Sequence, residues 1–138
     1  MSIKYKELLD SFVKPGRLID VFITGPLQIY VSTFLKHLFL RYFMLLTGIL
    51  NIIYNGHNFL LFNNLIKNPL PILKKFIHLE HGKYQIHRLY NLIIMYPVFL
   101  YVLINTKLSF ITQILFFINI TIGFLFNLFY FVFYYNNK

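Results

Sequence analysis

Four of the five histidines are the side chains in this chain best suited to chemistry: His57, His78, His81 and His87. Imidazole nitrogens bind zinc and other transition metals, usually as one of three or four protein ligands. His78 and His81 lie one helical turn apart, but the only carboxylate near them is Glu80, which points to a different face from at least one of them. A metal site is therefore the less favoured interpretation, and we expect no cofactor.

Acidic and nucleophilic side chains are too sparse for a recognisable catalytic group. The only acids are Glu7, Asp10, Asp20 and Glu80, so paired-carboxylate chemistry has no place after residue 80. Cysteine is absent, the serines lie in no known motif, and no glycine-rich phosphate loop occurs. We expect that the protein is not an enzyme; a lipid-modifying enzyme that uses His57, His87 and Asn91 is the least favoured alternative.

The elements that must position these side chains are long apolar runs. A helix needs roughly 20 apolar residues to cross a hydrocarbon core of about 30 Å. The sequence predicts an all-helical membrane bundle in a single domain, residues 1–138, with a basic loop at 63–88 and four spans at about 18–35, 42–62, 89–104 and 108–133.

The first run is the weakest of the four, because Asp20, Gln28 and the Gly25-Pro26 pair interrupt it. Asp20 lies near its end, one turn from Arg17, where such a pair can sit at a membrane surface. Two alternatives to a full span stay open. The run can lie in the membrane plane, or it can be a re-entrant segment that is broken at Gly25-Pro26.

Positive charge favours four crossings. With four spans, ten basic residues lie on one side and three on the other, whereas with three spans the asymmetry nearly vanishes. Positive residues concentrate on the cytoplasmic side of membrane proteins, so both termini are predicted to be cytoplasmic. The first group is Lys4, Lys6, Lys14, Arg17, Lys67, Lys74, Lys75, Lys83, Arg88 and Lys138; the second is Lys36, Arg41 and Lys107. Because this charge flanks apolar runs, we expect no nucleic-acid partner despite a net charge of +9.

The basic loop contains a predicted short amphipathic helix. Pro69 and Pro71 interrupt the chain after the second run, and Ile72 to His81 then places Ile72, Phe76 and Leu79 on one side. We expect this helix to lie on the cytoplasmic surface, with Lys74 and Lys75 toward anionic lipid headgroups.

Polar and small residues form one stripe on the second run and another on the fourth. Small residues let helices approach closely, and amides in hydrocarbon seek partners across a helix interface. We therefore interpret the stripes as helix-packing positions in the bundle interior; a polar pathway or ligand site is the alternative. The stripes are Gly48, Asn51, Asn55 and Asn58, and Thr112, Asn119, Gly123 and Asn127.

A second polar cluster is predicted where the third run begins, from His57, His87, Arg88 and Asn91. Arg88 and Asn91 lie one turn apart and share a face. Our hypothesis is that Arg88 ties the second and third helices together through Asn55 or Asn58. The alternative is that Arg88 extends to the headgroups, as cationic side chains at helix ends commonly do.

Two stretches of sequence resemble a known family. They comprise Arg41-Tyr42, Gly48-Ile49-Leu50 and Tyr54-Asn55-Gly56-His57-Asn58, followed by Gly82 to Asn91 and Met95-Tyr96-Pro97. This pattern resembles a small multi-pass membrane protein of nucleocytoplasmic large DNA viruses, the mimivirus-like giant viruses in particular. The resemblance spans roughly residues 41 to 97 and implies a virion or virus-modified host membrane, without a mechanism. No internal repeat is apparent in the sequence.

These observations lead to an expected role. We expect a structural or assembly component of a viral or virus-modified host membrane. Its partners would be the lipid bilayer and either copies of itself, as a homo-oligomer, or other membrane proteins. A small oligomeric channel or transporter subunit, lined by the asparagine stripes and Arg41, is the alternative.

Overall fold

The structure is a computed structural model that describes residues 13–81 and 85–135, without the side chains of 77–81 and 134–135. All regular structure in these residues is helical, and they contain no strand. The chain divides into two compact units, with the boundary between Pro69 and Leu70. Each unit contains one antiparallel pair of helices, and each is described by itself.

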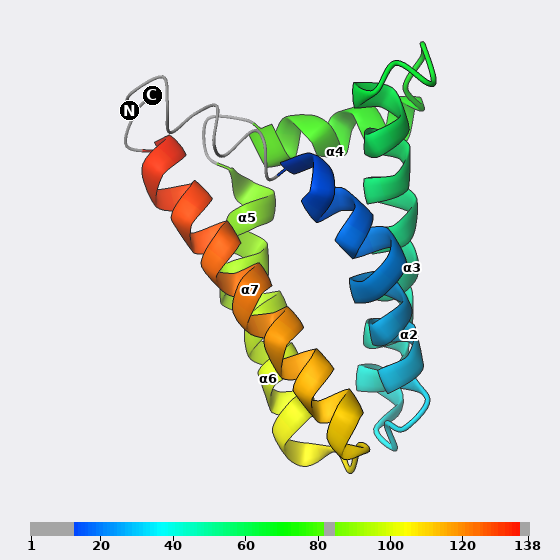
Figure 1. The fold of residues 1–138 in the computed structure, drawn as a ribbon, viewed down its shortest axis with the longest axis vertical. Coiled ribbons are helices and arrows are strands. Elements are labelled where there is room, and N and C mark those ends of the chain that lie inside the picture. The colour runs from blue at the N-terminus through cyan, green and yellow to red at the C-terminus, as the bar shows by residue number, and fades with distance from the viewer. Residues whose placement is uncertain (1–12, 82–84, 136–138) are drawn as a thin grey trace. The chain divides into compact units, whose positions relative to one another are not determined.

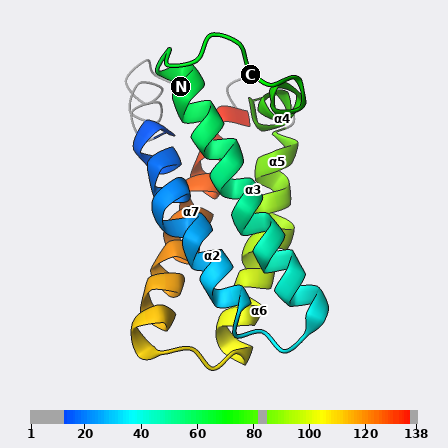
Figure 2. The same ribbon diagram turned by 90° about the vertical axis from the view of Figure 1, so that its right-hand side faces the viewer.

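The N-terminal hairpin comprises residues 13–62. Its first helix runs through residues 13–32 and consists of an α-helical start, a π-helical segment η1 (Asp20–Thr24) and helix α2 (Gly25–Ser32). A short loop then leads to α3 (Leu38–Phe62), which packs along α2 and η1 (Figures 1 and 2).

The C-terminal hairpin comprises residues 85–135. Its first helix consists of α5 (Ile86–Tyr90), the π-helical segment η2 (Asn91–Met95) and α6 (Tyr96–Asn105). The second helix, α7 (Phe110–Tyr135), returns alongside α6, η2 and α5 (Figure 1). Ser109 precedes α7, and its Oγ accepts a hydrogen bond from the Thr112 backbone N–H at 3.3 Å, which satisfies one donor at the helix start.

A proline explains the π-helical segment in each hairpin. Pro26 and Pro97 have no N–H to donate, and the ring of a proline inside an α-helix clashes with the carbonyl four residues earlier. In the residue before each proline, the backbone N–H reaches back five residues, from Gly25 to the Asp20 carbonyl and from Tyr96 to the Asn91 carbonyl. The wider turn keeps the chain helical through the proline. The predicted alternative of a break at Gly25-Pro26 is therefore wrong.

Within the described residues, three helices are long and apolar enough to cross a membrane: Leu38–Phe62, Ile86–Asn105 and Phe110–Phe133. They coincide with the second, third and fourth predicted spans, although the first two begin three to four residues earlier than predicted. The first predicted span coincides with the helix over residues 13–32, which ends three residues earlier than predicted and does not meet the same criterion. Many large apolar side chains face outward, among them Phe110 at 75% exposure and Phe22 at 73%, as lipid contact requires.

Helix α4 (Pro71–His81) forms where the sequence predicts a helix in the basic loop. It lies crosswise to α5 at the end of the C-terminal hairpin (Figures 1 and 2). Ile72, Lys74, Lys75 and Phe76 are all exposed on it. The side chains of His78, Leu79, Glu80 and His81 lie outside the description.

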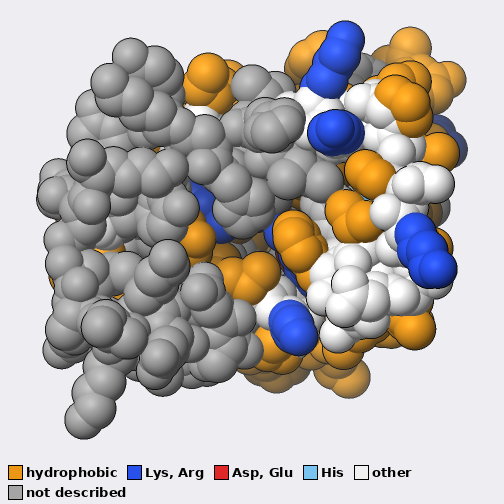
Figure 3. Space-filling model, turned by 90° about the horizontal axis from the view of Figure 1, so that it is seen from above, with side chains coloured by type: hydrophobic (Ala, Val, Ile, Leu, Met, Phe, Trp, Pro, Cys, Tyr) orange, Lys and Arg blue, Asp and Glu red, His pale blue; other side chains and the backbone are white. Residues whose placement is uncertain are grey.

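Several charged residues used in the sequence analysis lie outside the described residues: Lys4, Lys6, Glu7, Asp10, Lys83 and Lys138. The view from above in Figure 3 shows lysine and arginine side chains standing singly among hydrophobic and uncharged atoms on the described part of that face.

Candidate functional site

Arg17 joins the two helices of the N-terminal hairpin. Its side chain is only 4% exposed, and its Nη1 donates a hydrogen bond to Oδ1 of Asn55 on α3, at 3.1 Å. The guanidinium carbon lies 5.9 Å from the ring centre of Tyr54 and 5.3 Å from that of Phe62. Elsewhere, water or a carboxylate stabilises such a cation. Here, the Asn55 amide oxygen and two aromatic ring faces surround the Arg17 guanidinium instead.

Asn55 extends this contact along α3. Its Nδ2 donates to the backbone carbonyl of Asn51 at 3.1 Å and to the Asn51 Oδ1 at 2.5 Å. The Asn55 amide therefore faces Arg17 with its oxygen and the preceding turn of α3 with its nitrogen. Two members of the predicted stripe, Asn51 and Asn55, act together in holding one arginine.

Two glycines bring the backbones of this hairpin together. A Cβ atom added to Gly48 would lie 2.9 Å from the Gly25 carbonyl oxygen, and one added to Gly25 would lie 3.0 Å from the Gly48 carbonyl oxygen. Only hydrogen atoms fit in this space, so α2 and α3 cross with their backbones in direct contact. Gly48 of the predicted stripe thus lies at a backbone contact between the two helices.

The C-terminal hairpin has a corresponding contact around Asn127 and Tyr96. The Asn127 Nδ2 donates to the Tyr96 hydroxyl at 2.9 Å and to the Gly123 carbonyl at 2.8 Å. Asn91 donates to the Asn127 Oδ1 across a longer distance of 3.5 Å. A Cβ added to Gly123 would lie 2.5 Å from the Tyr96 hydroxyl oxygen, so this glycine makes room for the tyrosine.

Arg88 packs against aromatic rings of α7. Its side chain is 3% exposed, and its guanidinium carbon lies 3.8 Å from the ring centre of Tyr130 and 5.6 Å from that of Phe126. A cation this close to a ring face is attracted by the ring quadrupole. Arg88 thereby ties α5 to α7 within its own hairpin. The predicted bond to Asn55 or Asn58 joins residues of two different units and stays a prediction.

The remaining predicted positions make no hydrogen bond to the other helix of their hairpin that we describe. Asn58 is fully buried, and its Oδ1 lies 3.2 Å from the His57 Nδ1. Thr112 is buried and its hydroxyl lies 2.7 Å from the Ser109 hydroxyl, while Asn119 and His87 are half-buried. The structure thus brings His57 together with Asn58 and Asn91 together with Asn127.

Sequence reasoning missed several partners in these contacts: Arg17, Gly25 and Tyr96, and the rings of Tyr54, Phe62, Phe126 and Tyr130 that lie near the arginines. The sequence predicts for Arg17 only a flanking charge paired with Asp20 at the membrane surface, and for Tyr96 only a place in the family pattern. One signal can identify Arg17: the pair Arg17-Leu18 precedes Pro26 by the same interval at which Arg88-Leu89 precedes Pro97. Tyr96 has no comparable signal, because its role depends on Gly123, which is distant in the sequence.

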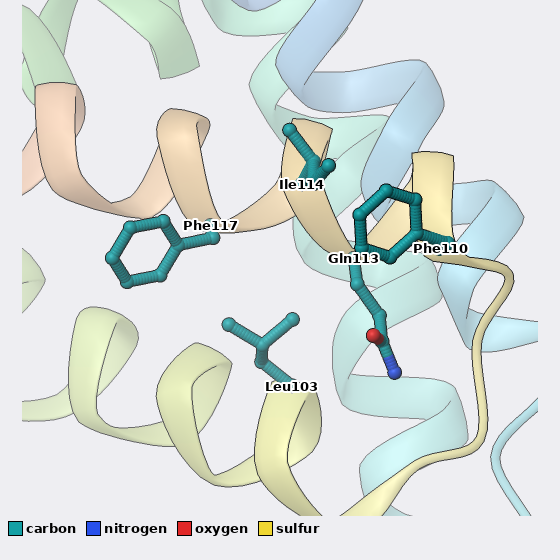
Figure 4. Close-up of a pocket in the computed structure, with 5 residues that line it drawn as sticks. All are labelled: Leu103, Phe110, Gln113, Ile114 and Phe117. Carbon is teal, nitrogen blue, oxygen red and sulfur yellow. The ribbon is translucent and has the colours of Figure 1, made fainter.

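Among the described residues, no group of three or more histidine, cysteine or acidic side chains able to hold a metal ion occurs. A recess between α6 and α7 is lined by Leu103, Phe110, Gln113, Ile114 and Phe117, of which only Gln113 is polar (Figure 4). It is wide open, and it offers one amide to a ligand.

Comparison with known proteins adds no relative: no family model, curated protein or solved structure matches this chain.

Proposed function

We propose that this chain is a four-span integral membrane protein with a structural or assembly role, in the viral or virus-modified host membrane that the family resemblance implies. In this proposal both termini are cytoplasmic, and α4 is an amphipathic helix on the cytoplasmic surface that contacts anionic headgroups through Lys74 and Lys75. The three apolar helices supply three of the spans, and residues 13–32 form the fourth.

One observation carries the structural role: among the described residues, the two buried arginines and two of the three buried asparagines, Asn55 and Asn127, contact the other helix of their own hairpin. Arg17 is bound by Asn55, Asn127 binds Tyr96, and Arg88 stacks on Tyr130. Polar side chains inside a membrane commonly either hold helices together or mark a pathway for ions and substrates. Here the contacts between helices support the first use.

The experiment that tests this role is quantitative mass spectrometry of purified particles. Membranes of infected cells serve as the second sample and alkaline carbonate washing as the extraction step. We expect the protein to remain with the membrane after washing and to be enriched in the particles relative to non-structural viral membrane proteins. Absence from particles, with the protein confined to cell membranes, would remove the virion role.

A small oligomeric channel or transporter subunit is the second candidate, and two buried amides favour it. Among the described residues, the Gln28 Oε1 and the Asn58 Nδ2 have no hydrogen-bond partner, although the two side chains are 2% and 0% exposed. Unsatisfied amides at membrane depth are costly and can mark a polar path. Ion flux in liposomes that Asn58→Leu abolishes would favour this candidate, whereas flux indistinguishable from protein-free liposomes would exclude ion conduction.

A further inference from the structure

The first helices of the two hairpins correspond residue by residue at an offset of 71. The π-helical segments begin at Asp20 and Asn91, and the following α-helices begin at Gly25 and Tyr96. Seven of the twenty positions from residue 17 to 36 carry the same amino acid as their counterparts: Arg17/Arg88, Leu18/Leu89, Ile23/Ile94, Pro26/Pro97, Tyr30/Tyr101, Val31/Val102 and Lys36/Lys107.

The second helices correspond at an offset of 72, because one extra residue lies between Lys107 and Phe110. Helix α3 begins at Leu38 and α7 at Phe110. All four buried residues of α3 have buried counterparts at this offset: Met44/Phe116, Gly48/Ile120, Asn55/Asn127 and Asn58/Tyr130. Thr112 is the one further buried residue in the described part of α7, and its counterpart Leu40 is half-buried.

Burial in the first helices follows the same register. Arg88, Phe99 and Val102 are the buried residues of the C-terminal one, and their counterparts Arg17, Gln28 and Val31 are buried too. The N-terminal helix buries Thr24, Gly25 and Ser32 in addition, and their counterparts are half-buried. The aromatic residue before each central asparagine, Tyr54 or Phe126, lies under the arginine of its own hairpin. Identity, helix boundaries, burial and arginine contacts therefore agree on a single alignment.

From this agreement we infer that the chain is a tandem repeat of one two-helix hairpin, with residues 17–62 repeated as residues 88–134. In each copy the arginine at the start of the first helix is the positioning residue that holds this helix against its partner. The sequence expectation of no internal repeat is thereby revised. A copy with two spans returns the chain to the side from which it started, so both copies enter the membrane in the same direction.

The repeat also bears on residues 13–32, the helix that is not apolar enough to be identified as a membrane span by its composition. If residues 86–105 cross the bilayer, their counterparts in the first copy cross it at the same depth, although Asp20, Gln28 and Ser32 make that copy less apolar. The inference does not rest on the proposed structural role, since a repeated hairpin can serve a structural protein or a channel, but it shares with that proposal the crossing of residues 13–32.

The absence of cysteine allows a direct test in the full chain, because each introduced thiol is the only one present. The first arm compares Lys36→Cys with Lys107→Cys, using a membrane-impermeant maleimide on sealed and on permeabilised membranes. The second arm attaches a nitroxide to Tyr30→Cys or Tyr101→Cys, which replace side chains 50% and 56% exposed. The ratio of collisions with oxygen and with a nickel chelate then reports the depth of each nitroxide.

We expect Lys36→Cys and Lys107→Cys to react from the same side, and the two nitroxides to report the same depth in the hydrocarbon. The control pair, Leu46→Cys and Ile118→Cys, lies at equivalent exposed positions of the second helices and should also agree in depth. Reaction of the two loops from opposite sides would overturn the inference. So would a nitroxide at position 30 that lies at the surface while the one at position 101 is deep.

Discussion

The two hairpins bring their helices together by different contacts at equivalent places. In the N-terminal hairpin, Gly25 and Gly48 let two backbones touch, whereas the counterparts of these residues in the C-terminal hairpin are Tyr96 and Ile120. There, Gly123 instead makes room for the Tyr96 ring. Close backbone contact and a tyrosine fitted against a glycine are thus alternative solutions to the same helix crossing.

The hairpins also differ in how they hold a buried arginine. Arg17 donates one N–H to the amide oxygen of Asn55, at 3.1 Å, and the rigid guanidinium fixes the direction of this bond. Arg88 lies over the Tyr130 ring, and the asparagine equivalent to Asn55 binds Tyr96 instead. An aromatic face attracts any cation placed above it, and a planar guanidinium also stacks on the ring, so the second arrangement depends on both the charge and the shape of the group.

The largest effect is expected at the backbone contact of the N-terminal hairpin. Gly48→Phe should destabilise the protein by more than the roughly 1 to 3 kcal/mol of ordinary overpacking, because even a Cβ would lie 2.9 Å from the Gly25 carbonyl oxygen. Thermal unfolding in detergent measures the change.

Gly56 provides the matched control for this prediction, since it lies on the same helix. A Cβ added there would meet only a Val21 methyl, at 3.7 Å. We expect Gly48→Ala to destabilise the protein and Gly56→Ala to be neutral or slightly stabilising, because alanine favours helix in both. Equal behaviour of the two alanine variants would show that α2 and α3 do not touch at Gly48.

Substitution of the two buried arginines should give the next largest loss of stability, and replacement by lysine should affect Arg17 and Arg88 differently. Arg17→Lys loses the guanidinium bond to Asn55 and keeps only the more distant Tyr54 and Phe62 rings, at 5.9 and 5.3 Å, so it should fall close to Arg17→Ala, with each losing about 1 to 2 kcal/mol of stability. Arg88→Lys loses the stacking of the guanidinium but keeps a cation near the Tyr130 ring, so it should retain part of the stability that Arg88→Ala loses. Thermal stability of the four variants in one detergent checks this order. If Arg17→Lys matches the unmodified protein, the amide geometry does not matter.

Hydropathy identified the apolar centres of three helices but not their ends. The helices α3 and α5 begin before the predicted spans because Arg41 and Arg88 lie inside them, while a hydropathy analysis treats charge as a boundary. A long side chain on a helix can carry its charge outward or stack it on a ring, so a charge does not end a helix. The Gly25-Pro26 pair misled for a related reason, since a wider turn absorbs the proline.

The contacts themselves were only half accessible from sequence. Periodicity identified Gly48, Asn55 and Asn127, because one helix determines which of its residues share a face. Their partners Arg17, Gly25 and Tyr96 lie on the other helix of each hairpin, and a single sequence does not give the register between two helices. The repeat escaped notice because most identities lie in the first helices, and the offset changes by one residue before the second.

The smallest effect is expected for the hydrogen bond between Tyr96 and Asn127 in the C-terminal hairpin. Both of its partners are neutral, whereas Arg17 in the N-terminal hairpin is a charged donor. Tyr96→Phe removes only the hydroxyl that accepts from Asn127, and polar contacts between membrane helices contribute about 0.6 kcal/mol on average. Asn127→Leu also removes the contact with Asn91 and should cost more, up to about 1.7 kcal/mol. Thr121→Val is the control, since its hydroxyl bonds only the Phe117 carbonyl of its own helix and faces outward.

A double-mutant cycle over Tyr96→Phe and Asn127→Leu isolates the bond itself. We expect a coupling free energy of about 0.6 kcal/mol, because each single variant removes the same hydrogen bond. The corresponding cycle over Arg17→Ala and Asn55→Leu should give a larger value, since a hydrogen bond from a charged donor is roughly twice as strong as a neutral one. If the two cycles give equal coupling, the charge of Arg17 adds nothing to its bond, and the two hairpins hold their helices together by contacts of equal strength.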